Sequence, residues 1–118
     1  MPEESGAAIE RLHKKARALT SEPGVYLMHN RAGEIIYVGK AKKLKNRVSS
    51  YFRSLERHTP KVLAMVLQVE DFETIVTSSE FEALVLECSL IKLHNPKYNI
   101  LLKDDKGYSY LRISRSDP

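Results

Sequence analysis

The segment from Lys40 to Lys61 concentrates residue types that can bind and cleave a phosphate backbone. It holds eight lysines and arginines against one acidic residue, Glu56. Charge runs are most often solvated helix faces, but a cluster of one sign beside aromatic residues favours a nucleic-acid backbone as the partner. The candidate DNA-binding residues are Lys40, Lys42, Lys43, Lys45, Arg53 and Arg57.

Arg47 and Tyr51 are four residues apart, so they are neighbours if this segment is helical. A guanidinium group can bind two non-bridging phosphate oxygens at once. Cleavage of a phosphodiester also needs an activated water. No histidine is placed to activate it, so a tyrosine is the candidate base, and cations such as Lys40 and Arg47 would favour its phenolate form. Tyr51 could equally be a core aromatic residue.

Glu87 is the candidate metal ligand among three glutamates of one predicted helix. Glu82 completes a capping box with Ser79, which explains its presence without chemistry. Glu87 lies mid-helix beside the apolar stripe, where a carboxylate needs a positive partner. A single carboxylate predicts one hard divalent ion, Mg²⁺ or Mn²⁺, completed by waters and the substrate phosphate. The predicted stripe is Phe81, Leu84, Val85, Cys88 and Ile91.

The elements that must position these residues begin with a β-hairpin. Two short apolar runs, Val25–Met28 and Ile35–Val38, flank the turn residues Asn30–Gly33. A four-residue loop pairs His29 with Glu34.

The register of the hairpin decides where its two tyrosines point. The four-residue loop puts Tyr26 directly opposite Tyr37 on one face of the sheet. A three-residue loop with a glycine bulge would shift the pairing by one and send them to opposite faces. We expect the four-residue loop.

The remaining pattern predicts an α+β fold with a small antiparallel sheet of about three strands flanked by helices. A helix is expected over residues 7–19, and another follows Gly39, which marks the strand-to-helix junction. The apolar stripe of that second helix is Leu44, Val48, Tyr51 and Leu55. Further expected elements are a helix starting at Thr59–Pro60, a strand over 71–77, a helix from Ser79 to before Pro96, a short segment over 98–102, a turn over 103–107 and an edge strand over 108–113.

The tripeptides Gly24-Val25-Tyr26 and Tyr37-Val38-Gly39 resemble the two signatures of the GIY-YIG nucleases. Further segments resemble the amino-terminal domain of the UvrC family, which makes an incision in bacterial nucleotide excision repair. They are Lys40–Leu44, Arg47–Tyr51, Glu82–Glu87 and Asn95–Lys106. Two tripeptides alone are a weak signal, but the ordered set is specific.

The resemblance implies a metal-dependent endonuclease that cuts double-stranded damaged DNA on the 3′ side of the lesion. It implies Glu87 as the acidic ligand, and it leaves open whether Tyr26 or Tyr37 is the base. UvrB would be a partner through a segment beyond this sequence. The candidate catalytic residues are Tyr26, Tyr37, Lys40, Arg47, Tyr51 and Asn99, and the structural glycines are Gly24 and Gly39.

Composition agrees with one soluble domain. The 118 residues carry a net charge of +4 and one cysteine, which excludes an internal disulfide and suits the cytoplasm. No apolar run could span a membrane. We expect a monomer with a helical segment over 1–20 and the endonuclease domain over 21–118. The alternatives are a basic DNA-binding module without catalysis and a free-standing GIY-YIG endonuclease.

Overall fold

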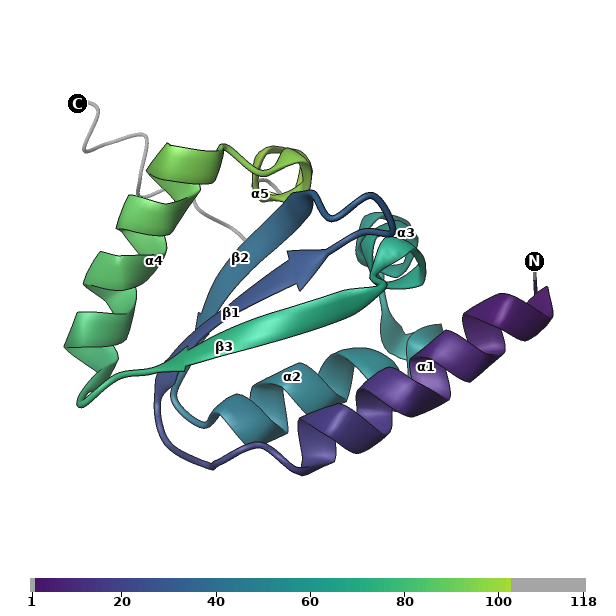
Figure 1. Cartoon of the computed structure of the whole chain (residues 1–118), viewed down its shortest axis with the longest axis horizontal. Helices are drawn as coiled ribbons and strands as arrows, with labels where there is room; N and C mark the ends of the chain where they lie inside the picture. The colour runs from purple at the N-terminus through teal and green to yellow at the C-terminus, as the bar shows by residue number, and fades with distance from the viewer. Residues whose placement is uncertain (1, 103–118) are drawn as a thin grey trace.

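A three-stranded antiparallel sheet with helices on both faces forms the domain (Figure 1). The computed structural model describes residues 2–102, with side chains from residue 6 onward. The expected turn over 103–107 and edge strand over 108–113 lie outside this range. The elements in chain order are α1 (Pro2–Arg17), β1 (Gly24–His29), β2 (Ile35–Ala41), α2 (Leu44–Arg53), the 3₁₀ turn η1 (Leu55–Arg57), α3 (Pro60–Gln68), β3 (Asp71–Val76), α4 (Glu80–His94) and α5 (Lys97–Leu101).

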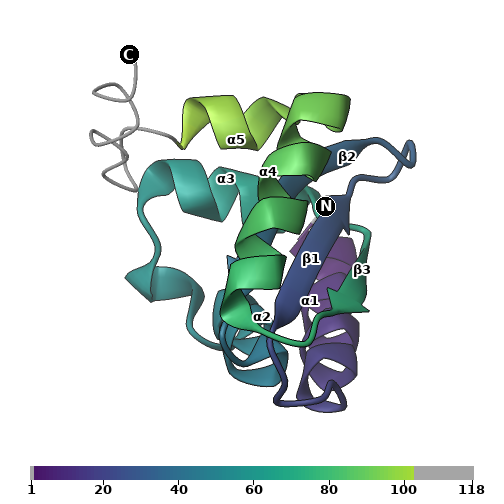
Figure 2. The same cartoon turned by 90° about the vertical axis from the view of Figure 1, so that its left-hand side faces the viewer.

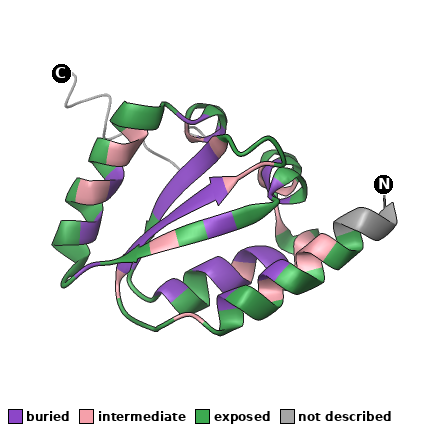
Figure 3. Ribbon diagram, viewed as in Figure 1, coloured by how far each residue is buried: buried purple, intermediate pink, exposed green. Residues whose placement is uncertain are grey.

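The central strand is β1, which pairs with β2 on one side and β3 on the other. Helices α1, α2 and α3 cover one face of the sheet, and α4 covers the other (Figures 1 and 2). Alternate residues of β1 therefore enter two cores: Tyr26 and Met28 pack towards α2, whereas Val25 and Leu27 pack towards α4. Because both faces are covered, β1 is buried almost throughout (Figure 3).

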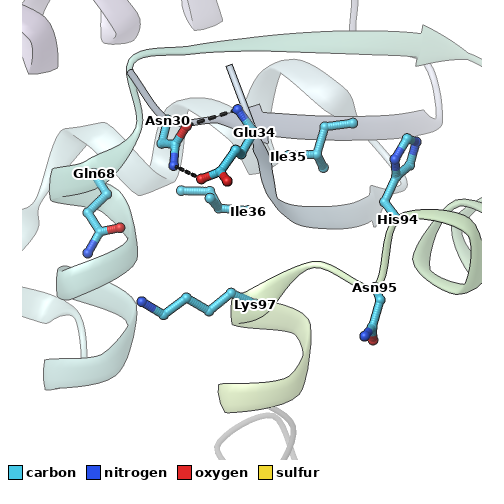
Figure 4. A pocket seen from close by; sticks show the side chains of 8 residues that line it. All are labelled: Asn30, Glu34, Ile35, Ile36, Gln68, His94, Asn95 and Lys97. Carbon is cyan, nitrogen blue, oxygen red and sulfur yellow. Dashed lines mark hydrogen bonds between the residues drawn. The ribbon is translucent and has the colours of Figure 1, made fainter. Parts of the chain in front are cut away.

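The hairpin loop is the three-residue form, so the expected four-residue loop is wrong. The Asn30 amide donates to the Glu34 carbonyl at 3.0 Å, and Gly33 adopts a positive φ of 86°. The Asn30 side chain both accepts from the Glu34 amide and donates to the Glu34 carboxylate (Figure 4). These bonds close the loop on Arg31–Gly33.

A second irregularity follows the loop and returns the Tyr37 side chain to the sheet face that carries Tyr26. His29 pairs with Ile35, but Met28 pairs with Tyr37, so β2 carries one extra residue. We expected Tyr26 to lie opposite Tyr37, but it lies opposite Gly39. Two shifts of one residue each leave both tyrosines on the same face, which confirms that part of the prediction.

Helix α4 buries a different face from the one expected. The predicted stripe ran through Phe81, Leu84 and Val85, but Phe81 is 73% exposed and Val85 49% exposed. The residues that face the sheet are Ala83, Leu86, Glu87, Leu90 and Ile91, and of these only Ile91 belongs to the predicted stripe. Apolar residues occur on every side of this helix, so periodicity could not distinguish its buried side. The small Ala83 is buried against Val25, Leu27 and Val38 of β1 and β2.

The other elements follow their local signals. Thr59 caps α3 and Ser79 caps α4 through their hydroxyl groups, as expected, although Glu82 bonds back to the amide of Ser78 and not of Ser79. Helix α1 begins earlier than predicted and buries Leu12 and Ala16 against α2. No helix among residues 2–102 has the length and apolarity to span a bilayer.

Candidate active site

Three tyrosine rings form a buried cluster between the sheet and α2. The Tyr26 and Tyr51 hydroxyls lie 2.7 Å apart, with ring centroids separated by 5.7 Å. The Tyr37 ring lies 6.2 Å from that of Tyr26. Strands β1 and β2 supply two of the rings, and α2 supplies the third because Tyr51 lies one turn beyond the buried Val48.

Gly39 makes room for this cluster. We expected Gly39 at a strand-to-helix junction, but it lies inside β2, opposite Tyr26. A Cβ atom at this position would overlap the Tyr26 phenol, so the close approach is made by a ring of the protein itself. A Cβ at Gly24 would similarly overlap the Ile75 carbonyl of β3.

Burial dominates the acidity of the hydroxyl pair. Removal from solvent raises the pKa of Tyr26 well above its usual value and raises the pKa of Tyr51 as well. The Arg47 guanidinium opposes both shifts but does not overcome burial. At Tyr26 and Tyr51, burial therefore outweighs the effect of the protein's own cations on the pKa, contrary to the expectation that these cations favour a phenolate.

Arg47 and Lys40 lie at the mouth of the cluster, where solvent can reach them. The Arg47 guanidinium carbon lies 5.9 Å from the centre of the Tyr51 ring. Both cations line a concave surface of about 530 Å³, together with Lys42, Lys43 and Ser50. This surface therefore holds two predicted catalytic residues, Lys40 and Arg47, and three predicted DNA-binding residues, Lys40, Lys42 and Lys43.

Glu87 reaches the same edge of the sheet from the opposite face. Its carboxylate accepts a hydrogen bond of 3.1 Å from the backbone amide of Lys40, on the outer edge of β2. Burial raises the pKa of Glu87, an effect that Lys40 partly opposes. The Glu87 charge in turn raises the pKa of Tyr51, so the carboxylate and the tyrosine cluster are electrostatically coupled.

The donor set at Glu87 is sparse. Within residues 2–102, no three side chains of histidine, cysteine, aspartate or glutamate come together as a metal cluster. A cation at Glu87 would therefore rely on one carboxylate, which fits an ion that keeps most of its waters.

Asn99 fixes the edge strand on which both Glu87 and Lys40 depend. Its side-chain oxygen accepts from the Val38 amide and its nitrogen donates to the Val38 carbonyl, each at 2.8 Å. The amide group thus acts as one residue of a neighbouring strand. Helix α5 positions Asn99 because Tyr98 and Leu102 are buried beside it.

The structure separates the remaining predicted residues from this centre. Lys45 and Arg53 line a neighbouring groove between α1 and α2, and Arg57 lies in the exposed turn η1. Sequence reasoning missed His58, whose ring nitrogen lies 2.8 Å from the Tyr51 carbonyl oxygen and secures the end of α2. A separate polar cavity near the hairpin loop, lined by Gln68, His94 and Lys97, contains none of the predicted residues (Figure 4).

Comparison with known proteins shows the same sequence pattern over most of the chain. A family model described as a UvrC-like GIY-YIG domain matches residues 22–100. The UvrABC system protein C of Acetivibrio thermocellus is 56% identical over 106 residues, and that of Clostridium botulinum strain Hall is 57% identical over the same length. In each case the match covers 90% of this chain but only 17% of the relative.

Solved structures agree with the fold. The GIY-YIG amino-terminal endonuclease domain of UvrC from Thermotoga maritima, described as bound to its catalytic magnesium, has a TM-score of 0.68 and 44% identity, covering 75% of this chain and 96% of that one. Four variants of that domain, with one asparagine replaced by alanine or one of three tyrosines replaced by phenylalanine, are also described as bound to the catalytic divalent cation. The chain belongs to the family of UvrC-like GIY-YIG domains.

Proposed function

We propose that this chain is a DNA endonuclease domain that hydrolyses one phosphodiester bond with a single divalent cation held at Glu87. The observation that carries the proposal is the position of this buried carboxylate. It contacts the edge of β2 at Lys40 and is electrostatically coupled to Tyr51, so an acid, two cations and a tyrosine cluster converge there.

The site suits a cation. Glu87 is 6% exposed, and burial raises the pKa of its carboxyl group more than Lys40 lowers it. A bound cation would therefore stabilise the ionised carboxylate. Its oxygen donors match hard ions such as Mg²⁺ or Mn²⁺. When bound, the cation would neutralise phosphate charge and polarise a water. In the Thermotoga domain the cation persists in each of three tyrosine variants, which supports a carboxylate anchor.

The protein's own side chains would have distinct roles around the phosphate. Arg47 would bind non-bridging oxygens as a planar donor, and Lys40 would add a second positive charge. The candidate bases remain Tyr26 and Tyr37. Asn99 holds the strand that carries Lys40, so it would act by positioning.

The biological setting follows from the relatives, which are much longer than this chain. We propose that it works as part of a UvrC-type protein in bacterial cytoplasm, cutting damaged double-stranded DNA on the 3′ side of a lesion in concert with UvrB. We also propose that the helical segment over 1–20 belongs to the same folding unit as residues 21–118, and that the isolated domain is monomeric.

The decisive experiment compares two glutamates of α4 in the UvrC-type protein that carries this domain. A lesion-bearing duplex is incubated with UvrA, UvrB, Mg²⁺ and either Glu87→Gln or the matched control Glu82→Gln. Glu87→Gln should abolish 3′ incision. Glu82→Gln should retain it, since the Glu82 carboxylate only bonds Ser78 near the helix start. If Glu82→Gln abolished 3′ incision and Glu87→Gln did not, the assignment of Glu87 as the metal ligand would be refuted.

A further inference from the structure

A groove between α1 and α2 lies beside the candidate active site and is lined by polar and basic side chains. Its volume is about 400 Å³, and it is lined by His13, Arg17, Lys45, Asn46, Ser49 and Arg53. His13 and Arg17 are four residues apart on α1, whereas Lys45, Ser49 and Arg53 are four apart on α2. Each helix thus presents one ridge of side chains to the groove.

We infer that this groove binds a second phosphate group of the DNA, beyond the one that is cut. The inference rests on the proposed endonuclease function and assigns part of its substrate contact to α1, which lies outside the matched range 22–100.

The positive charge of the groove is not balanced by acidic groups in the part of the chain that the structure describes. Arg17, Lys45 and Arg53 are exposed, and none of them takes part in a salt bridge with another described residue. Among residues 6–102, no acidic side chain lines the groove. By contrast, Arg11 and Lys15 of the same helix form salt bridges with Glu70 and Asp71. The uncompensated cations therefore face the groove.

The polar residues between these cations suit an anion with oxygen atoms. Asn46 has an amide that can donate to a phosphate oxygen. The Ser49 hydroxyl donates to the Lys45 carbonyl at 2.6 Å, so this buried residue forms a small, uncharged base of the groove. His13 adds a ring that can donate from nitrogen.

The groove continues from the surface that holds Lys40 and Arg47. Asn46 lines both, so a strand whose scissile phosphate lies at Arg47 could pass directly over Asn46 to Arg17. The position of α1 is fixed independently of DNA, because Leu12 and Ala16 are buried and the Lys45 amide bonds to the Thr20 carbonyl at 3.0 Å. The groove is therefore preformed.

The test is the salt dependence of duplex binding without divalent cation, in the Glu87→Gln background so that no cutting occurs. Arg17→Gln is compared with Lys14→Gln, which removes the same charge from the same helix but lines a different surface. Arg17→Gln should reduce the slope of log K against log salt by about 0.9, the value for one phosphate contact. Lys14→Gln should leave the slope unchanged.

Three results would overturn the inference. Equal slopes in Arg17→Gln and Lys14→Gln would mean that the groove is a solvated surface, while the Glu87 dependence of incision would still stand. If millimolar inorganic phosphate at constant ionic strength raised the melting temperature of the parent but not of Arg17→Gln, and displaced no duplex from either, the groove would hold free phosphate and not DNA. If Arg17→Gln weakened binding of polyglutamate but not of duplex, the ligand would be an acidic protein segment.

Discussion

The hydroxyl groups of Tyr26 and Tyr51 lie 2.7 Å apart and join the central strand to helix α2 in the interior of the domain. Each hydroxyl is a hydrogen-bond partner of the other, so removing one leaves its neighbour with a lost partner in a buried site. The pair is therefore a structural bond as well as a part of the candidate active site.

The first prediction is energetic coupling within this pair. Tyr51→Phe should lower the free energy of unfolding by about 1–2 kcal/mol, because the buried Tyr26 hydroxyl loses a partner. Adding Tyr26→Phe should cost less than it does alone, by about 1 kcal/mol. Urea unfolding of both single variants and the double variant measures this, and strict additivity would show that the hydroxyls do not interact.

Stability at alkaline pH should depend on the same pair. The folded pKa values of Tyr26 and Tyr51 are raised, whereas the unfolded tyrosines titrate near about 10. Above that pH the unfolded state releases protons that the folded state retains, so the free energy of unfolding falls as pH rises. The double phenylalanine variant should lose less stability than the parent between pH values just below and above about 10. Parallel curves would contradict the direction of these shifts.

Glu87 should oppose folding when no divalent cation is present. Its folded pKa is raised, so its contribution to stability is present at acid pH and is lost as pH rises from about 4.3 through the folded value. At pH 7 with a chelator, Glu87→Gln should be at least as stable as the parent.

Addition of Mg²⁺ gives the matching control for that prediction. The cation should raise the melting temperature of the parent by mass action and leave Glu87→Gln unchanged. A similar rise in both proteins would place the cation elsewhere.

We expect Lys42, Lys43 and Lys45 to increase the affinity for DNA by contacting its phosphates. Lys42 and Lys43 line the surface that holds Arg47, and Lys45 lines the neighbouring groove. The triple variant Lys42→Ala, Lys43→Ala, Lys45→Ala should bind duplex with a salt slope reduced by up to about 2.7, or about 0.9 for each lost contact. Fluorescence anisotropy over a range of salt concentrations measures the slope. An unchanged slope would mean that these charges are only solvated.

The identity of the general base separates the two hairpin tyrosines. Loss of a base typically lowers the rate by about 10²–10⁴, so Tyr26→Phe and Tyr37→Phe should differ if only one of them has this role. Single-turnover incision at several pH values measures the difference, and the base variant should lose the alkaline rise in rate. Equal effects at every pH would point to a structural role for both.

Local signals in the sequence predicted much of the fold. The caps at Thr59 and Ser79 specify their own backbone, and the structure confirms both. The turn residues Asn30–Gly33 indicate where the hairpin turns, but not that its loop has three residues and is followed by an extra residue in β2. The buried face of α4 could not be predicted, because apolar residues occur all round the helix and only packing against β1 and β2 selects Ala83 and Glu87.

Residue types in the sequence can propose members of the candidate site, but not the contacts between them. The pairing of Tyr26 with Tyr51 and of Asn99 with Val38 depends on contacts 25 and 61 residues apart in the chain. No periodicity encodes such contacts. The same holds for the α1 groove, where His13 and Arg17 have significance only once α2 lies beside them.

The two irregularities of the hairpin constrain how its length can change. The loop and the extra residue of β2 each shift the alternation of side chains by one, and together they keep Tyr37 in the tyrosine cluster. Deleting Ile36 alone would remove the extra residue and leave Ile35 opposite His29 and Tyr37 opposite Met28, so both tyrosines would keep their face. A single-residue change in length is therefore compatible with an intact tyrosine cluster at the unpaired residue Ile36, and working versions of the domain should vary in length there and not between Tyr37 and Gly39.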